Sequence, residues 1–522
     1  MGEQLVVLVP RPNANGDLHL GHLSGPFLAA DVFTRYARAT GRQVLFGSGV
    51  QDTQTYVVTT AHRLGVGPQE LAARSTKEIA TTLELMGIAV DGFVVSSEAY
   101  QRAVLGTLEP LHSAGRLRLR PVPLPYLEHT GEYLVDAHVR GSCPACLADN
   151  TAGLCETCGH PIPAGELVDP WSPEHPDQPV RSREVPVLVL PMEDYRDQLH
   201  DHLARCEAGM RPHMVQAVRE IMSRPLADLP VTHPGSWGIP APFPEVSGQV
   251  INPMVEAIGW SRHAAALSAE HRGGPVPATD ELWLPGAGSR VVYFHGFDNL
   301  YAFAIAGVGL LLAHGGRYAL PEWFITNELY ELDNEKFSTS RGHVVWGRDL
   351  LAELPRDLVR FYLALTSPEF QRTSFSRDAM TRVTNSLLVG PWNRIADEVD
   401  RWVGQTRPVP EQSRIASARI VARFAASYER PFFSLHRTAH TLATQLDRLD
   451  RWNVRPGDAG DFCHQVEVVL RCAAPILIDL AGRAAVQPEI RPEPAATEIT
   501  PRRLPRLGAK QGMTCHATPR TW

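Results

Sequence analysis

The stretch QLVVLVPRPNANGDLHLGHLSGPFLAADVFTRY, residues 4–36, decides the expected fold. Its first part, residues 4–10, is a short apolar run that is partly β-branched, which is typical of a buried strand in a parallel sheet. Over residues 20–40 the apolar side chains recur at a helical spacing, and Gly41 stands where a helix C-cap is expected. The stretch therefore predicts a strand, a polar turn and a helix.

The same alternation continues along the chain. Residues 43–49 (QVLFGSG) and 91–97 (DGFVVSS) have the composition of strands, and residues 61–87 between them have a helical pattern. Strand signals return at SRVVYFHGFDN, residues 289–299. This alternation of strands and helices indicates an α/β fold with a parallel sheet.

Changes of composition divide the rest of the chain. Prolines, glycines and cysteines are dense in the middle, the later part is almost entirely of helical pattern, and the end is rich in proline and arginine without periodicity. We expect six segments: the first half of the α/β domain at 1–119, an inserted domain at 120–225, the second half at 226–320, a region with a polar loop at 321–380, a helical bundle at 381–486 and a disordered tail at 487–522.

Composition also limits the class of protein. The 522 residues carry a formal net charge of −7, which argues against a generally basic nucleic-acid-binding surface but allows a local one. No apolar run approaches the roughly 20 residues of a membrane-spanning helix, and the start lacks the pattern of a signal peptide. We therefore expect a cytoplasmic protein without a membrane partner, and a monomer is the default expectation.

Four of the eight cysteines are clustered in CPACLADNTAGLCETC, residues 143–158. Two CxxC pairs at this separation are typical of a tetrahedral thiolate site for Zn²⁺, and free or disulfide-bonded cysteines are the alternative. Four thiolates leave no open coordination position, so we expect one structural zinc ion. The predicted ligands are Cys143, Cys146, Cys155 and Cys158.

Two polar motifs carry candidate chemistry. His19 and His22 lie where the first strand gives way to a helix, and imidazole donors beside free helical N–H groups suit a polyphosphate; two unrelated surface histidines are the alternative. In DNEKFSTSRGHVVWG, residues 333–347, Lys336 stands beside small hydroxyl residues and can close over a phosphate, unless this is an ordinary exposed loop. The order and separation of the two motifs are far more specific than either motif alone.

These motifs resemble those of a known family. HLGH at 19–22 resembles the HIGH signature of class I aminoacyl-tRNA synthetases, and KFSTS at 336–340 resembles their KMSKS loop. SWGIPAP at 236–242 and LVRFYLALTSPE at 358–369 make the chain similar to the methionyl-tRNA synthetase branch in its archaeal and eukaryotic style. The resemblance extends from residue 5 to about residue 485 and implies a Rossmann-type catalytic domain, a zinc knuckle and an anticodon-binding helical bundle.

The resemblance implies that the protein activates an amino acid with ATP and Mg²⁺, releases pyrophosphate and transfers the acyl group to tRNA. It assigns the phosphates to His19, His22 and Lys336, space for adenine to Gly21 and the ribose to Asp298. The expected ATP-binding residues are Pro12, Asn15, His19, Gly21, His22, Asp298, Lys336, Phe337, Ser338, Thr339 and Ser340.

One position of the loop departs from the family pattern. Thr339 stands where the family has a lysine, so one cation of the expected phosphate clamp is missing. Losing one charge-assisted contact costs about 2–3 kcal/mol of transition-state stabilisation unless the neighbouring Arg341 replaces it. Slower activation is one expectation that follows.

The expected amino-acid pocket departs further from the methionine pattern. Its residues are Arg11, Asn13, Gln51, Met254, Trp260 and Phe303. Gln51 falls where the family has the aspartate that pairs with the substrate ammonium, and a neutral amide weakens such a buried contact by kilocalories. Two interpretations stay open: Asp52 takes over that role or the alignment shifts by one residue, or the enzyme activates another amino acid or related carboxylic acid, with Arg11 available to an extra carboxylate.

The helical segment carries candidate tRNA contacts. Asn393 and Arg394 occupy a recognisable position of the family's bundle, and Trp452 falls near a tryptophan that stacks on an anticodon base, although a packing role is the alternative. The leading function is a methionyl-type synthetase. The alternatives are a specialised paralogue that forms an amide on a small-molecule amine or uses aminoacyl-tRNA outside translation, and a catalytically weak tRNA-binding regulator.

Overall fold

The computed structural model describes residues 4–273, 280–337, 343–486, 490 and 497–508. Contacts divide the chain into two compact units, which are described separately. Unit 1 comprises Met1–Asp17, Leu45–Ala80 and Val90–Asn327, and unit 2 comprises Leu18–Val44, Thr81–Ala89 and Glu328–Trp522. Within the described segments, no helix combines the length and the apolar character that crossing a membrane requires.

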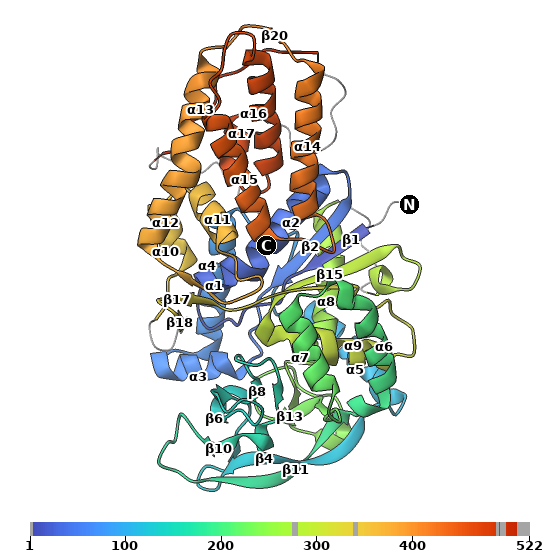
Figure 1. The fold of residues 1–522 in the computed structure, drawn as a ribbon. Coiled ribbons are helices and arrows are strands. Elements are labelled where there is room, and N and C mark those ends of the chain that lie inside the picture. Colours follow the sequence, from blue (N-terminus) through green and yellow to red (C-terminus); the bar gives the residue numbers. More distant parts are fainter. Residues whose placement is uncertain (1–3, 274–279, 338–342, 487–489, 491–496, 509–522) are drawn as a thin grey trace. The chain divides into compact units, whose positions relative to one another are not determined.

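Unit 1 is built on a five-stranded sheet in the order β16-β15-β1-β2-β3 (Figure 1). The strands are β1 (Gln4–Leu8), β2 (Gln43–Gly49), β3 (Gly92–Val94), β15 (Ser289–Gly296) and β16 (Trp323–Asn327). β1 pairs in parallel with β15, β15 with β16, and β2 with β3. The predicted parallel sheet is confirmed. Because the strand order changes direction at β1, the carboxyl ends of β1 and its neighbours form the edge where α/β proteins bind ligands.

The connection from β2 to β3 differs from the expected single helical segment. It holds two helices, α3 (Thr55–Leu64) and α4 (Pro68–Met86). Gly65 ends α3 in the left-handed conformation with φ of 67°, which glycine adopts without strain, and Pro68 begins α4, where its missing N–H costs nothing. The apolar spacing runs across both helices, so periodicity alone does not reveal the break.

The core of unit 1 forms where α8 (Glu256–His271) packs against α5 (Glu98–Ser113) and β3. The two helices approach closely at Gly259, where an added Cβ would lie 2.5 Å from the Cα of Val104. This close approach brings the first turns of both helices together in the interior. Tyr100 and Glu256, one from each helix, are both completely buried.

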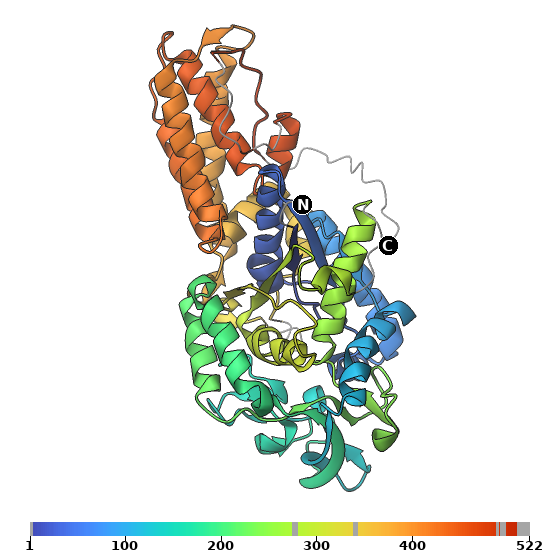
Figure 2. The ribbon, with the colours of Figure 1, turned by 90° about the vertical axis from the view of Figure 1, so that its right-hand side faces the viewer.

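A long insertion leaves unit 1 between β3 and β15. Its backbone is the antiparallel hairpin of β4 (Arg118–Leu127) and β11 (Val180–Leu190), which forms the curved lower edge of the view in Figure 2. The short strands β6 (Arg140–Ser142), β7 (Asp149–Thr151), β8 (Gly153–Leu154), β9 (Pro161–Ile162) and β10 (Val168–Trp171) lie between the two long strands in sequence. They enclose a separate apolar core that includes Val139, Ile162 and two of the clustered cysteines.

Unit 2 is mainly helical. Its longer helices are α2 (Leu28–Ala39), α11 (Arg356–Leu365), α13 (Gly390–Asp400), α14 (Glu411–Tyr428), α15 (Leu435–Asp450) and α16 (Ala459–Ala473). α15 packs against α11, α13, α14 and α16, and Figure 1 shows α13 to α16 running side by side as a bundle. The predicted C-terminal helical bundle is therefore confirmed.

A buried arginine connects several segments of unit 2. Arg360 is completely inaccessible to solvent and forms an ion pair of 2.7 Å with Asp31 of α2. It also donates to the carbonyl oxygens of Pro475 (2.7 Å), Ile476 (2.9 Å) and Met86 (3.1 Å). One guanidinium thus satisfies backbone acceptors from two parts of the chain as well as the Asp31 carboxylate, which its fork of donors allows.

The C-terminal segment differs from the expectation of disorder beyond Gln487. Its described residues 497–508 pack on the helical bundle, and β21 (Glu498–Ile499) pairs with β20 (Arg407–Pro408). Arg506 lies 2.6 Å from Asp397 and 2.9 Å from Asp400, both on α13. A neighbouring helix thus supplies carboxylates that pair with an arginine of this proline- and arginine-rich segment and help to hold it in place.

Candidate active site

The HLGH motif lies in unit 2 at the start of α1 (Leu20–His22). Backbone hydrogen bonds to the last residues of the polar loop hold it. The N–H of Leu20 donates to the carbonyl of Val345 at 3.1 Å, and the N–H of Gly347 donates to that of Leu18 at 2.9 Å. The two sequence motifs are therefore structurally connected within one unit.

The ring of His19 is held between two aromatic neighbours. Its centroid lies 3.9 Å from that of His22 and 5.0 Å from that of Phe337, whose ring is almost parallel to it. The Nδ1 atom of His19 accepts the N–H of Gly21 at 3.1 Å. A neutral imidazole that accepts through Nδ1 carries its proton on Nε2, so His19 offers an N–H donor of fixed direction, as a phosphate contact requires.

Gly21 makes this ring position possible. A Cβ atom at residue 21 would lie 2.8 Å from Cε1 and 2.9 Å from Nδ1 of His19, which is closer than packed atoms allow. Any side chain at this position displaces the His19 ring or breaks its hydrogen bond. The glycine expected to leave space for adenine also leaves space for His19.

The polar loop is described in part. Lys336 ends β18 (Glu335–Lys336), and its backbone pairs with Glu331 of β17 (Tyr330–Leu332). Phe337 is buried against His19. The predicted contacts of Ser338, Thr339, Ser340 and Arg341 lie outside the described residues.

The most unusual feature of unit 1 is a buried charged cluster at the end of β1. Arg11 donates to the hydroxyl of Tyr100 at 2.6 Å and forms an ion pair of 3.1 Å with Glu256. The same carboxylate oxygen of Glu256 accepts the Tyr100 hydroxyl and, at 3.0 Å, that of Thr53. Arg11 was expected to be available to a substrate carboxylate, but the protein supplies an internal partner. We call Arg11, Tyr100, Glu256 and Thr53 the Arg11 cluster.

Burial and charge act in opposite directions on the pKa values of Glu256 and Arg11. Burial raises the pKa of Glu256, while the Arg11 guanidinium and the hydroxyl donors favour its ionised form. Burial alone would lower the pKa of Arg11, but Tyr100 and Glu256 hold it above the ordinary value. Three donors converge on one oxygen of Glu256, which is the arrangement of a carboxylate paired with a cation.

Aromatic side chains form the apolar side of this region. The guanidinium carbon of Arg11 lies 5.6 Å from the ring centroid of Trp260. Trp260 meets Phe303 edge-on at 6.1 Å, and Phe303 also lies 4.9 Å from Tyr293. His295 stacks on Phe303 at 6.1 Å, and burial lowers its pKa to about 4, so this ring is neutral at pH 7. The predicted pocket residues Arg11, Trp260 and Phe303 are thus neighbours.

Gln51 lies beside the residues that follow β1. Its backbone N–H donates to Pro12 O at 2.9 Å, its carbonyl accepts the N–H of Ala14 at 2.9 Å, and it forms a parallel bridge with Asn13. The Gln51 side chain donates from Nε2 to the carbonyl of Pro253 at 3.2 Å, next to the half-buried Met254. One of the two amide N–H groups is therefore used within the protein, and Oε1 is an acceptor.

Asp52, the alternative ammonium partner, has a different environment. Its carboxylate accepts a hydrogen bond from the Ser96 hydroxyl, and its backbone carbonyl accepts the indole N–H of Trp237 at 2.7 Å. Its chain neighbour Thr53 belongs to the Arg11 cluster, while the Asp52 carboxylate itself pairs with Ser96. Its contacts give no support to the idea that it replaces the family's aspartate.

The remaining predicted ATP residues of unit 1 lie near strand ends. Asp298 follows β15, accepts the side-chain N–H of Asn299 at 3.1 Å, and has a pKa raised by burial. Asn15 donates weakly to the hydroxyl of Thr60 at 3.5 Å. The ribose role of Asp298 and the ATP role of Asn15 stay predictions.

The four clustered cysteines fit a zinc ion. Their sulfur atoms all lie within 4.8 Å of one another. Cys143 lies 3.9 Å from Cys158, and Cys146 lies 3.6 Å from Cys155. A tetrahedron with Zn–S distances of about 2.3 Å has edges of about 3.8 Å, so these separations match tetrathiolate coordination.

Two matching turns position the cysteines. The N–H of Leu147 donates to the carbonyl of Cys143, and the N–H of Gly159 donates to that of Cys155, each at 2.9 Å. Both donors have positive φ, 62° for Leu147 and 73° for Gly159. In addition, the amide of Asn150 donates to the Cys155 sulfur at 3.3 Å, which stabilises a thiolate there.

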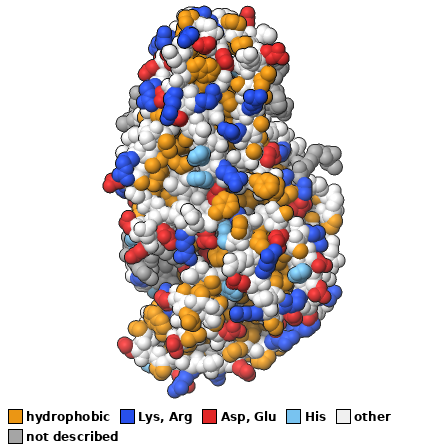
Figure 3. All heavy atoms as spheres, in the orientation of Figure 1, with side chains coloured by type: hydrophobic (Ala, Val, Ile, Leu, Met, Phe, Trp, Pro, Cys, Tyr) orange, Lys and Arg blue, Asp and Glu red, His pale blue; other side chains and the backbone are white. Residues whose placement is uncertain are grey.

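The predicted tRNA contacts in unit 2 have partners within the chain. Asn393 exchanges two hydrogen bonds with the backbone of Leu507, at 2.7 and 2.9 Å. Arg394 forms a two-pronged ion pair with Asp450, and Trp452 packs edge-on against Phe462 at 5.8 Å. A tRNA role for these residues stays a prediction. On the face shown in Figure 3, basic and acidic side chains are intermixed.

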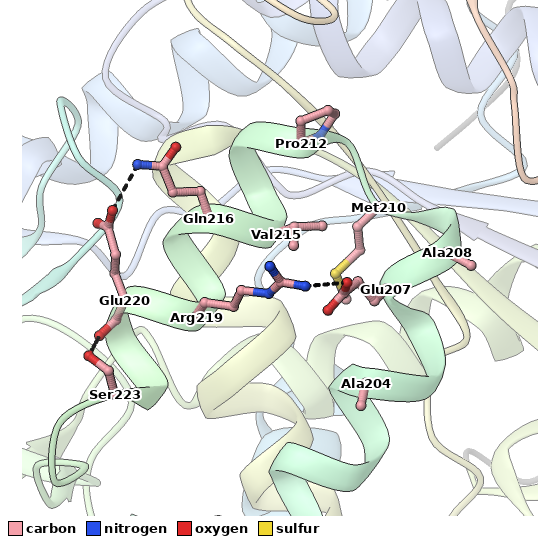
Figure 4. Close-up of a pocket in the computed structure, with 10 residues that line it drawn as sticks. All are labelled: Ala204, Glu207, Ala208, Met210, Pro212, Val215, Gln216, Arg219, Glu220 and Ser223. Atoms are coloured by element: carbon pink, nitrogen blue, oxygen red, sulfur yellow. Dashed lines mark hydrogen bonds and ion pairs between the residues drawn. The ribbon is translucent and has the colours of Figure 1, made fainter.

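An open groove lies elsewhere in unit 1, between α6 (Arg196–Cys206) and α7 (Pro212–Met222) (Figure 4). Its lining includes Met210 and Val215, and Arg219 bridges to Glu207 at 2.6 Å. None of the predicted site residues lines this groove. We therefore assign it no part in the chemistry.

Sequence reasoning missed three members of the Arg11 cluster: Tyr100, Thr53 and Glu256. Glu256 belongs to MVEAIGW, the stretch that supplied Met254 and Trp260, so an acidic residue beside a pocket tryptophan was a usable signal. Tyr100 and Thr53 offered none, because their roles depend on helix packing and not on a local pattern.

Comparison with known proteins agrees with this geometry. The family described as "tRNA synthetases class I (M)" matches residues 5–399. A protein of Thermomicrobium roseum named methionine–tRNA ligase is 30% identical over 403 residues, covering 76% of this chain and 68% of that protein. A methionine–tRNA ligase of Chloroflexus aggregans is 28% identical over 523 residues, covering 90% of this chain and 84% of that protein.

Solved structures have the same fold. Mycobacterium tuberculosis methionyl-tRNA synthetase in complex with methionyl-adenylate gives a TM-score of 0.70 at 19% identity, covering 92% of this chain and 93% of that one. A second structure of that enzyme with the same adenylate gives 0.72 at 18% identity, covering 97% and 99%. The chain therefore belongs to the class I tRNA synthetase family of the M type and is a ligase.

Proposed function

We propose that this protein activates an amino acid other than methionine as its adenylate and transfers the aminoacyl group to tRNA. Family membership supports the synthetase chemistry. The contacts of the Arg11 cluster support a changed substrate, because they put a buried ion pair where the resemblance places the amino-acid pocket.

The activation step needs placement and charge stabilisation more than acid–base chemistry. A carboxylate oxygen of the amino acid attacks the α-phosphorus of ATP, the bond to the bridging oxygen breaks, and pyrophosphate leaves with the negative charge. His19 contributes an Nε2–H donor of fixed direction, with His22 and Lys336 as its expected companions at the phosphates. Donors that are already oriented stabilise the transition state without reorganising, which accounts for much of such catalysis.

The transfer step follows without a covalent enzyme intermediate. A ribose hydroxyl of the terminal tRNA adenosine attacks the carbonyl carbon of the adenylate, and AMP leaves. Mg²⁺ would neutralise the phosphates of ATP during activation. Zinc would be held by Cys143, Cys146, Cys155 and Cys158 and would stabilise the insertion, since four thiolates leave no position for a substrate.

One observation carries the change of substrate: Arg11 is 9% exposed and is paired with the completely buried Glu256. An apolar side chain placed against this guanidinium would cover its remaining donors without replacing their hydrogen bonds, which is costly. Gln51 adds to the difference because it offers an amide oxygen where the family offers a carboxylate.

Pyrophosphate exchange into ATP tests the proposal. The full chain is incubated with ATP, Mg²⁺ and either methionine alone or the nineteen other common amino acids. We expect exchange with the mixture and at most a small fraction of that rate with methionine, and aminoacylation of bulk tRNA by the active acid. Brisk exchange with methionine alone would contradict the change of substrate, and no exchange with any acid would contradict the synthetase function.

A further inference from the structure

The Arg11 cluster leaves hydrogen-bonding capacity unused. A guanidinium has five N–H donors, and the contacts of Arg11 to Tyr100 and Glu256 use two of them. Because these contacts and the Trp260 ring fix the plane of the guanidinium, the other donors point in fixed directions. A fixed, partly accessible donor set is suited to recognition of a ligand oxygen.

Two buried atoms on residues that contact Arg11 have no hydrogen-bond partner among the described residues. They are Nε1 of Trp260, an obligatory donor, and Oε1 of Glu256, an acceptor. Trp260 is 1% exposed and Glu256 is not exposed at all. Leaving such groups unpaired is costly. The unpaired donor and the unpaired acceptor therefore indicate a ligand that has both an acceptor for the indole N–H and an N–H donor for the carboxylate.

Charge restricts the ligand further. The ion pair of Arg11 with Glu256 makes the cluster neutral, and Tyr100 and Thr53 add hydroxyls without charge. A substrate side chain with a charge of its own would bring an unbalanced charge into a buried site, at a large desolvation cost. An uncharged side chain with one acceptor oxygen and N–H donors matches the unpaired atoms and keeps the site neutral.

We propose that the substrate is an amino acid with a side-chain carboxamide, and that Arg11 and Trp260 determine this specificity. The carboxamide oxygen accepts from the guanidinium and the indole N–H, and its amide N–H donates to Glu256. This inference rests on the proposed function, because it assigns the substrate class of the same site.

The test compares kcat/KM in pyrophosphate exchange for side chains of similar shape. The series is glutamine and asparagine, their acids glutamate and aspartate, and the apolar methionine and leucine. We expect a carboxamide to exceed its acid and the apolar analogue by at least about 10-fold, as for sites built around a substrate hydrogen bond. Preference for an acid or an apolar side chain would overturn the inference and leave the proposed function standing. No exchange with any of the twenty common amino acids would overturn both.

Variants identify the residues responsible. Trp260→Phe keeps the ring and removes the N–H, and we expect the ratio of carboxamide to methionine turnover to fall about 10-fold. Arg11→Met should lower the same ratio, which does not depend on the amount of folded enzyme. Trp283→Phe is the matched control, since Trp283 is equally buried and also has an unpaired indole N–H. An unchanged ratio in Trp260→Phe, or an equal fall in Trp283→Phe, would refute the assignment.

Discussion

The turn formed by the HLGH motif at residues 19–22, here called the HLGH turn, and the Arg11 cluster fix the positions of their side chains in different ways. At the turn, a glycine without a side chain, a backbone N–H and a stacked phenylalanine fix the ring of His19. In the cluster, Arg11 and Glu256 hold each other through charge and hydrogen bonds, with hydroxyl groups satisfying the same carboxylate.

The two regions differ in how much substitution they tolerate. The turn tolerates little, because one added methyl group meets the imidazole. The cluster is a balance of charges, so compensating substitutions can change its side chains together; under the proposed function they would also change the substrate. One chain can therefore keep the reaction with ATP and still use a different amino acid, as proposed.

Removing the zinc ion has the largest expected effect. This effect should be confined to the insertion and should spare the HLGH turn and the Arg11 cluster. Cys155→Ser should abolish tight zinc binding, which is worth about 10 kcal/mol or more in structural sites, and should loosen the insertion around its small core. Metal analysis and hydrogen exchange measure this. Cys463→Ser is the control variant: it changes a cysteine of α16 outside the cluster and should retain one zinc ion per chain. An increase in hydrogen exchange at the HLGH turn as large as that in the insertion would contradict this prediction.

Breaking the ion pair tests the charge balance of the Arg11 cluster. Arg11→Met leaves the carboxylate of Glu256 buried without its cation and should cost about 3–5 kcal/mol of unfolding free energy. Adding Glu256→Gln should recover part of that loss, because a neutral amide still accepts from the hydroxyls. Urea unfolding of the single and double variants measures the coupling. Additive losses would show that the pair does not act as a unit.

A methyl group at the HLGH turn tests its steric precision. Gly21→Ala should lower the rate of pyrophosphate exchange about 100-fold, because the Cβ displaces His19 from its donor position. Gly106→Ala is the control, since a Cβ on that glycine of α5 meets no atom within 4 Å. Exchange by Gly21→Ala at the level of the control would contradict the proposed role of the turn.

A pH-dependent contact outside both regions gives the smallest effect. Glu174 of the insertion accepts from His138 at 2.6 Å and from His62 of α3 at 2.8 Å, and these hydrogen bonds lower its pKa to about 2. A carboxyl with a lowered pKa stabilises the fold above its unfolded value of about 4.5, and this contribution is lost as the pH falls toward 2.

Glu174→Gln should therefore lower the unfolding free energy by up to about 1 kcal/mol at pH 7, with the difference from wild type shrinking below pH 4.5. Urea unfolding across this range measures it, and the exposed Glu184→Gln serves as control. A difference that grows as the pH falls would have the wrong sign. Substrate preference should not change, which would confirm that the effect lies outside the two compared regions.

Local patterns predicted much of this molecule. The apolar run and helical spacing around the HLGH turn gave the first strand, turn and helix, and the CxxC spacing gave four sulfur atoms that converge. These features depend on residues close in sequence. The break at Gly65 escaped prediction because the apolar periodicity continues past it.

Distant partners could not be predicted. Arg11 was identified as a pocket residue, but its role depends on Tyr100 and Glu256, which packing of α5 on α8 brings to it. The C-terminal segment likewise owes its order to Arg506 meeting carboxylates of α13. In both cases the sequence shows a charged side chain but not which distant residue pairs with it.

The identity of the bound adenylate shows directly which amino acid the enzyme activates. The full chain is incubated with ATP, Mg²⁺, inorganic pyrophosphatase and equal concentrations of the twenty common amino acids, and the acyl-adenylate is identified by mass spectrometry. We predict an adenylate of an amino acid other than methionine, with a carboxamide side chain. Methionyl-adenylate as the main product would contradict it.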